Sequence, residues 1–545
     1  MARLAPTYLP REPHATVLYR LVKEHGAEFL RHARESYDGP LPRYVEDELR
    51  GYLHCGDFAR GFVHLRCHQC EHDLLVPFSC KNRGLCPSCA GRRMAAQAAH
   101  LVDRVLPAVP IRQFVLSFPF ELSLLAATKP EVLRALARIH AEELARHSKD
   151  VAKRSGETGK LHAGAVTFVQ RFGSSLNVHV HLHTCALDGV YVEGDDDDDG
   201  APRFVPAAPP SRAELYVLTE RVALRVTTWL RKRGYAKEDD HASNDTPDRT
   251  FAEMLAQVAA QRGTLENVKD DTGECEGPAE PAAPFPRDEA VTRHGFNLHA
   301  SLTLAADDDL GRERLCRYGL RPPFSLSRFR VLHDGRISYR VKKSARRTSR
   351  CRLMTPLECI ARLCALVPPP RYPLTRFHGV LAPRAKLRSR IVPKLPATAT
   401  RPCASSPSRP STPEIPGGRV DARPRPRARV GDVIPSAVPV GATTLARAIV
   451  GADVYAPNIL SAKHLDRIAG GLLYAATSNV PWATLLARTF QVDVKSCLRC
   501  GARLEVRAVL SDHDIARRFV DAMHATARAP PPSTDSLLRF EPVLA

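Results

Sequence analysis

Residues 177–183 have the sequence NVHVHLH, in which histidines alternate with aliphatic residues. Successive side chains of a β-strand point to opposite faces, so His179, His181 and His183 share one face and the aliphatic residues share the other. Neutral imidazole is the commonest metal ligand among protein side chains. The pattern therefore predicts a strand that rests on a core and presents a metal-binding histidine pair. The alternative is a polar strand face whose histidines meet only water.

The flanking sequence predicts an α+β fold around this strand. Residues 111–118 are typical of a strand, residues 130–147 of a helix, and residues 162–170 of a second strand that leads through a Gly-Ser-Ser turn into residues 176–187. A strand, a helix and then a strand pair favour a small α+β sheet domain. The fold class expected is therefore α+β.

Length and charge indicate the number of domains and the kind of partner. A chain of 545 residues exceeds one compact core, so two to four domains are expected. The formal net charge of +20 favours a polyanionic partner, nucleic acid first, over a merely basic enzyme. We find no apolar run of about 18 residues and no secretory signal, so we expect no membrane partner. The expected location is the cytoplasm, with nucleoid association when DNA is bound.

Two cysteine pairs have the spacing of a zinc ribbon. Cys67 and Cys70 are separated by 15 residues from Cys86 and Cys89, which makes a C-x2-C-x15-C-x2-C motif. Four thiolates complete a closed tetrahedron, so the motif predicts a structural Zn2+ held by these four residues. Unrelated free cysteines are the alternative.

Other cysteines and histidines leave the ligand set open. Cys55, Cys80, His54 and His68 lie close enough in sequence to replace a ligand or to form a second site. A third pair, Cys497 and Cys500, has no obvious partner pair. An incomplete ribbon and simple packing cysteines explain this third pair equally well.

The motifs and composition divide the chain into four parts. Residues 10–106 are expected to form a zinc-binding DNA-recognition domain, and residues 107–395 a catalytic domain with a mobile insertion at 235–290. Residues 396–440 are rich in Pro, Ser and Arg and predict a disordered linker. Residues 441–530 are expected to form a small C-terminal segment with the CxxC knuckle.

Several motifs, taken in order, resemble one protein family. After the cysteine-rich start come an HLH triplet at 181–183 with Asp188-Gly189 five residues later, and then Arg317-Tyr318 before Arg321-Pro322-Pro323. Further matches are QFVLS at 113–117, QRFG at 170–173, FNLHA at 296–300, HGV at 378–380 and the stretch 482–500. This set resembles the transposases of the insertion sequence 91 family, which belong to the HUH endonucleases. The resemblance covers most of the chain apart from the insertion and the linker.

The resemblance implies an HUH-type antiparallel-sheet nuclease domain and a catalytic divalent ion, Mg2+ or Mn2+. By position, His181 and His183 would bind the ion, and Tyr318 would cut one DNA strand and remain attached to its 5′ phosphate. His179 is an additional candidate ligand. The third ligand stays open, with Gln170 and His299 as candidates. The partners implied are single-stranded DNA at element ends and target DNA, and an oligomer is compatible with this reading.

The sequence departs from the family pattern beside the tyrosine. Family members with two tyrosines carry them four residues apart on one helix, but Arg314 occupies the first of these positions here. Arg314 could hold a phosphate and cannot attack it, so the single-tyrosine, common-region type is favoured. A buried aromatic beside Leu315 and Leu320 is the alternative reading of Tyr318.

Basic residues outside the motifs are candidates for contacts with phosphates. The expected DNA-binding residues are Arg92, Arg93, Arg314, Lys342, Lys343, Arg346 and Arg347. The function expected is a transposase that nicks and rejoins single-stranded DNA by a rolling-circle-like route. A plasmid replication initiator or relaxase shares this chemistry, and a non-catalytic zinc-ribbon DNA-binding regulator is the rival from another class.

Overall fold

A computed structural model describes residues 12–36, 40–193, 202–235, 265–266, 290–341, 351–394, 480–490 and 493–526. Helices combine with antiparallel sheets, so the predicted α+β class is confirmed. The linker 396–440 and nearly all of the insertion 235–290 lie outside the described residues. None of the described helices is both long and apolar enough to cross a membrane.

A six-stranded antiparallel sheet carries the histidine sequence in one of its two central strands. Its order is β10 (Val291–Arg293), β11 (Phe296–Leu304), β3 (Ile111–Ser117), β6 (Val178–Leu187), β5 (Gly164–Phe172) and β15 (Thr375–Gly379). In the register, His181 pairs with Gln170 of β5, and His183 pairs with Val115 of β3. Side chains of directly opposed residues lie on the same face of a sheet.

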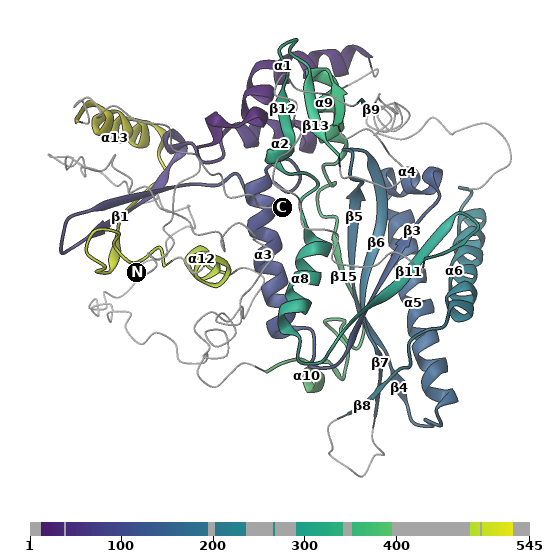
Figure 1. The fold of residues 1–545 in the computed structure, drawn as a ribbon. Helices are drawn as coiled ribbons and strands as arrows, with labels where there is room; N and C mark the ends of the chain where they lie inside the picture. The colour runs from purple at the N-terminus through teal and green to yellow at the C-terminus, as the bar shows by residue number, and fades with distance from the viewer. Residues whose placement is uncertain are drawn as a thin grey trace, which may run out of the picture.

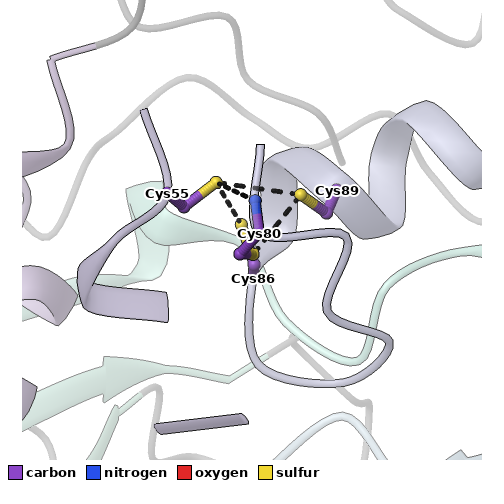
Figure 2. Close-up of side chains that lie close together, drawn as sticks. All are labelled: Cys55, Cys80, Cys86 and Cys89. Carbon is purple, nitrogen blue, oxygen red and sulfur yellow. Dashed lines mark hydrogen bonds between the residues drawn. The ribbon is translucent and has the colours of Figure 1, made fainter. Parts of the chain in front are cut away.

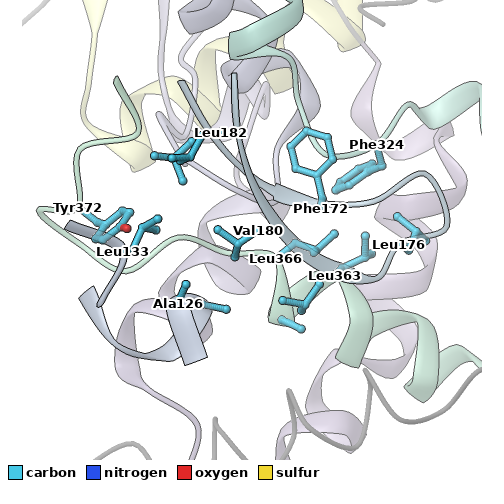
Figure 3. Packing of buried hydrophobic residues seen from close by; sticks show 14 of the residues in the cluster. Ala126, Leu133, Phe172, Leu176, Val180, Leu182, Phe324, Leu363, Leu366 and Tyr372 are labelled. Carbon is cyan, nitrogen blue, oxygen red and sulfur yellow. The ribbon is translucent and has the colours of Figure 1, made fainter. Parts of the chain in front are cut away.

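Helices cover both faces of this sheet (Figure 1). On one side lie α4 (Phe120–Thr128), α5 (Pro130–Arg154) and α6 (Arg212–Lys232), and on the other lie α3 (Pro87–Arg104) and α8 (Asp309–Leu320). Val178, Val180 and Leu182 are buried in the core of the first side, where Ala126 of α4 and Leu133 of α5 pack near them (Figure 3). Full burial of such a side chain contributes about 1.5–3 kcal/mol. The alternation in β6 therefore orients the histidines toward α8.

The N-terminal part holds two further helices and a small sheet. α1 (Val17–Ser36) and α2 (Arg43–Leu53) precede the hairpin of β1 (Phe62–Cys67) and β2 (Asp73–Pro77). The third strand of this sheet is β16 (Leu504–Leu510), which pairs antiparallel with β1. The sequence predicts a separate C-terminal segment, whereas the structure places its strand in the N-terminal sheet. Pairing between such distant residues leaves no trace in a local pattern.

The remaining elements complete the framework. They are the sheet β12 (Phe329–Val331), β13 (Ile337–Arg340), β14 (Cys351–Met354) and β9 (Leu265–Glu266), the sheet β4 (Leu161–His162), β7 (Gly189–Val192) and β8 (Arg203–Pro206), and the helices α9 (Pro356–Ala365), α10 (Arg388–Ile391), α12 (Trp482–Phe490) and α13 (His513–Thr526). In Figure 1, α12 and α13 lie on the same side of the molecule as the hairpin of β1.

Candidate active site and cysteine clusters

The three histidines of β6 form one continuous row. The ring centroids of His179 and His181 are 5.1 Å apart, and those of His181 and His183 are 4.9 Å apart. His181 is 9% exposed and His183 is 4% exposed, while His179 is half-buried. The predicted placement of these side chains on one strand face therefore agrees with the structure.

Burial keeps these imidazoles neutral. Desolvation lowers the pKa of His181 to about 3, with a smaller contribution from His179, and lowers the pKa of His183 well below its ordinary value. Burial also lowers the pKa of His179. A neutral imidazole has one nitrogen lone pair for a metal ion. All three rings are thus in the ligating form at neutral pH.

The hydrogen bond of His181 favours metal binding through Nε2, and that of His183 does so when the Gln113 amide is turned over. His181 Nδ1 lies 2.9 Å from the carbonyl oxygen of His179 and must donate to it, because a carbonyl only accepts. The side-chain amide of Gln113 lies 3.1 Å from Nδ1 of His183, whose buried Nε2 has no hydrogen-bond partner. A half-turn of that amide presents its oxygen to Nδ1–H and leaves the Nε2 lone pair for an ion.

Gln170 fits the position of a third ligand better than His299 does. Its Nε2 donates to the carbonyl oxygens of Tyr318 at 2.6 Å and of Gly319 at 3.2 Å, while its buried Oε1 has no partner. His299 is two strands from His183 across β3, about 9–10 Å away at the usual strand spacing, and its Nε2 contacts Ser301 at 2.9 Å.

Helix α8 places Tyr318 over the histidine row. The tyrosine ring meets His183 edge to face, with 5.3 Å between centroids and an interplanar angle of 85°. The guanidinium carbon of Arg321 lies 5.0 Å from the tyrosine ring centroid. Tyr318 is half-buried, whereas Leu315 is in the core and Arg314, one turn earlier, is exposed. Tyr318 therefore lies beside the histidine row and is less buried than Leu315.

Two local features set the position of α8. The Asp308 carboxylate accepts a hydrogen bond from the Gly311 amide at 2.7 Å and caps the helix start. Near the helix end, a Cβ on Gly319 would overlap the Phe168 ring of β5. Glycine thus lets the backbone of α8 approach the sheet closely, beside Tyr318.

A buried ion network connects α8 to α3 and α12. Glu313 accepts from Arg317 at 2.7 Å and from Arg488 of α12 at 2.8 Å. Arg488 also pairs with Asp103 of α3 through both guanidinium Nη groups. Sequence reasoning missed Asp103, Glu313 and Arg488 as members of one cluster, since no local spacing connects three residues on three different helices.

The first cysteine cluster is formed by Cys55, Cys80, Cys86 and Cys89, whose sulfur atoms lie within 4.8 Å of one another (Figure 2). Three of the sulfur–sulfur distances are 3.5–3.7 Å. Four sulfurs around Zn2+ with bonds of about 2.3 Å are about 3.8 Å apart, so the thiols have the arrangement of a closed structural zinc site.

The predicted grouping of Cys67, Cys70, Cys86 and Cys89 is wrong. Cys67 and Cys70 lie instead with Cys497 and Cys500 in a second cysteine cluster. The reason is the β1–β2 hairpin: Cys67 is at its tip, whereas Cys55 and Cys80 flank its open end, about 17 Å away along a five-step strand. Cys497 and Cys500, which had no partner pair in the sequence, therefore complete a cluster. Within the described residues, these two clusters are the only groups of three or more His, Cys, Asp or Glu side chains with this spacing.

The predicted DNA-binding residues are distributed unevenly. Arg92 and Arg314 are exposed. Arg93 donates to the carbonyl oxygens of Asn82 at 3.3 Å and of Lys81 at 3.0 Å, and so supports the loop between Cys80 and Cys86. The other four lie outside the described residues, namely Lys342, Lys343, Arg346 and Arg347.

Comparison with known proteins gives two family matches. The model Zn_Tnp_IS91, described as "Transposase zinc-binding domain", matches residues 21–118, which include the whole first cysteine cluster. The model Y2_Tnp, described as "Putative transposase", matches residues 164–389, which include β5, β6 and α8. The zinc-binding match and the cluster together support a structural Zn2+.

One curated relative also matches. It is the transposase for insertion sequence element IS801 of Pseudomonas savastanoi pv. phaseolicola, which is 31% identical over 154 residues. The match covers 28% of this chain and 35% of the relative, so about a third of the relative's length is spanned. No solved structure matches the chain.

Proposed function

Because this chain belongs to the insertion sequence 91 family of transposases, we propose that it nicks and rejoins single-stranded DNA at element ends through a covalent 5′-phosphotyrosine intermediate. The observation that carries the proposal is the contact of the Tyr318 ring with His183, on a strand face that presents neutral imidazoles. A nucleophile beside a candidate ion site is the arrangement that metal-assisted phosphoryl transfer requires.

In the proposed reaction, the phenolic oxygen of Tyr318 forms a bond with phosphorus as the bond from phosphorus to the 3′ oxygen breaks. The phenol proton leaves to solvent and the departing 3′ oxygen takes up a proton. Attack by the 3′ hydroxyl of another strand reverses the step. Because the phosphotyrosine keeps the phosphodiester energy, rejoining needs no nucleotide cofactor.

His181, His183 and the Oε1 atom of Gln170 are the side chains proposed to hold Mg2+ or Mn2+, and His179 is the outer candidate. The ion would polarise the scissile phosphate and stabilise the charge that develops on it. Two imidazoles with one amide oxygen suit Mn2+ well. Gln170 also binds the backbone of α8, so the same side chain would fix the distance between the ion and Tyr318.

A cavity of about 460 Å3 lies beside this site and suggests the path of the DNA strand. Gln170, Gly319 and Arg321 line it from the catalytic side, and Arg83 and Arg93 line it from the zinc-binding domain. Arginines there would neutralise phosphates next to the cleaved one. Arg92, Arg314 and the basic residues at 342–347 are further candidates for contacts with phosphates.

The test is an adduct assay with purified protein, a labelled single-stranded oligonucleotide from an element end, and Mn2+. A band of protein linked to DNA is expected on a denaturing gel, and His181→Ala is expected to abolish it. His333→Ala, at an exposed hairpin position, is the matched histidine control and should keep full activity. Binding of the correct end sequence with no adduct from the wild-type protein would refute the nuclease proposal.

Gln113→Ala should weaken the proposed ion site without removing a ligand. Gln113 orients His183 through its Nδ1, and loss of such a supporting hydrogen bond typically lowers metal affinity about 10- to 100-fold. The Mn2+ concentration for half-maximal adduct formation should rise by about this factor, while the rate at saturating Mn2+ changes much less. An unchanged Mn2+ titration would show that Gln113 does not orient a ligand.

A further inference from the structure

The second cysteine cluster joins the N-terminal β1–β2 hairpin to the described C-terminal residues. The sulfur atoms of Cys67 and Cys500 are 3.5 Å apart, and those of Cys70 and Cys497 are 3.4 Å apart, although these pairs are 433 and 427 residues apart in sequence. All four sulfurs lie within 4.8 Å of one another. A disulfide needs about 2.05 Å between its sulfurs, so the four thiols form one cluster rather than two bridged pairs.

The two CxxC turns have the same backbone structure. The amide of Cys67 donates to the His72 carbonyl at 2.9 Å, and the amide of Cys497 donates to the Ala502 carbonyl at 2.7 Å. Glu71 and Gly501 follow the second cysteines in the left-handed conformation, with φ of 54° and 74°. Their amides donate back to the carbonyl oxygens of Cys67 and Cys497.

Backbone amides in these turns also point at the sulfur atoms. The amides of Gln69 and Cys70 contact the sulfur of Cys67, and the amide of Ala502 contacts that of Cys500. Hydrogen bonds of this kind stabilise thiolates, which are the form of cysteine that binds metals. Each turn therefore directs backbone donors at one of its cysteine sulfur atoms.

The apolar contacts around the second cluster are few. Its surroundings are a small core with Leu65, Leu74 and Leu504, next to the β16–β1 strand pair. A core of this size contributes little stability, and small segments of this kind commonly depend on a bound metal. A bound metal ion would therefore stabilise the packing of the described C-terminal residues against the hairpin.

We propose that Cys67, Cys70, Cys497 and Cys500 bind a second structural Zn2+, which fastens the C-terminal segment to the N-terminal hairpin. The chain then contains a zinc ribbon whose two knuckles come from opposite ends of the sequence. All four ligands are protein thiolates, so this site is closed and takes no part in the cleavage chemistry.

This second site also holds α12 in place. Arg488 of α12 precedes Cys497 by nine residues and is bound between Asp103 and Glu313, on the helices α3 and α8. Leu485 of α12 packs with Ala95 and Ala99 of α3. The proposed zinc ion therefore positions a helix that braces α8, the helix that carries Tyr318.

The zinc content of the purified full-length protein, measured by elemental mass spectrometry under reducing conditions, tests this proposal. The wild type is expected to hold two zinc ions per chain, and Cys500→Ser one. Cys500 is exposed, so its replacement disturbs little packing. Cys500→His supplies another zinc ligand and should restore the second ion, and Arg499→Ala, between the two ligands, should keep both.

Substitution with Co2+ gives an independent readout, because its visible absorption bands report tetrahedral thiolate coordination. The bands should lose about half of their intensity in Cys500→Ser and recover in part in Cys500→His. Hydrogen exchange at the amides of β16 should accelerate in the serine variant only. One zinc ion per wild-type chain, or two in both Cys500→Ser and Cys500→His, would overturn the proposal.

Discussion

Tyr318→Phe is expected to abolish the covalent adduct between protein and DNA while leaving DNA affinity within about twofold of the wild type. Phenylalanine keeps the ring that meets His183 and Arg321, so the packing of α8 should not change. The variant lacks only the oxygen that would form the bond with phosphorus. A catalyst without its nucleophile has no route to this intermediate.

Three measurements check this expectation on the same preparation. A denaturing gel reports the adduct, fluorescence anisotropy reports binding of the oligonucleotide, and thermal unfolding reports the fold. Tyr216→Phe is the matched control, since Tyr216 lies on α6 at 36% exposure and should form adduct normally. If Tyr318→Phe still forms the adduct, another residue must be the nucleophile.

Arg488→Ala is expected to lower the free energy of unfolding by about 3–5 kcal/mol. The side chains of Arg488, Asp103 and Glu313 are 1%, 3% and 2% exposed, so removal of the guanidinium takes away the cation that pairs with two buried carboxylates. Breaking a buried ion pair in this way typically costs about 3–5 kcal/mol. Glu313 keeps its ion pair with Arg317, which limits its share of the cost.

Denaturant unfolding of the wild type and the variant measures this cost. Arg499→Ala, an exposed arginine of the same segment, should change the free energy of unfolding by no more than about 0.5 kcal/mol. In the double variant with Asp103→Ala, the loss should be smaller than the sum of the single losses, because both substitutions remove the same ion pair. A cost below about 1 kcal/mol for Arg488→Ala would contradict the buried network.

The same substitution should slow the proposed cleavage. Arg488 contacts no part of the histidine row, so any loss of adduct formation would come from movement of α8. A slower rate at saturating Mn2+, with an unchanged Mn2+ concentration for half-maximal adduct, would separate this effect from that of Gln113→Ala. Arg488→Ala therefore tests the position of Tyr318, and Gln113→Ala independently tests the affinity of the proposed ion site.

The histidine row could be predicted from the sequence because its pattern is local. A repeat of two residues is enough to place His179, His181 and His183 on one strand face and Val180 and Leu182 in the core. The role proposed for Tyr318 comes from the family motif, and the structure adds its contact with His183. The supporting residue Gln113 was part of a matched motif, yet its hydrogen bond to His183 depends on the pairing of β3 with β6.

The grouping of the cysteines, in contrast, was decided only by the tertiary structure. Spacing along the chain favoured Cys67 and Cys70 with Cys86 and Cys89, but the length of the β1–β2 hairpin separates those pairs and the pairing of β16 with β1 brings Cys497 and Cys500 to its tip. The ion network of Arg488 depends on the same long-range docking. Sequence patterns record the periodicity and spacing of neighbours, whereas contacts between distant segments follow from how strands and helices pack.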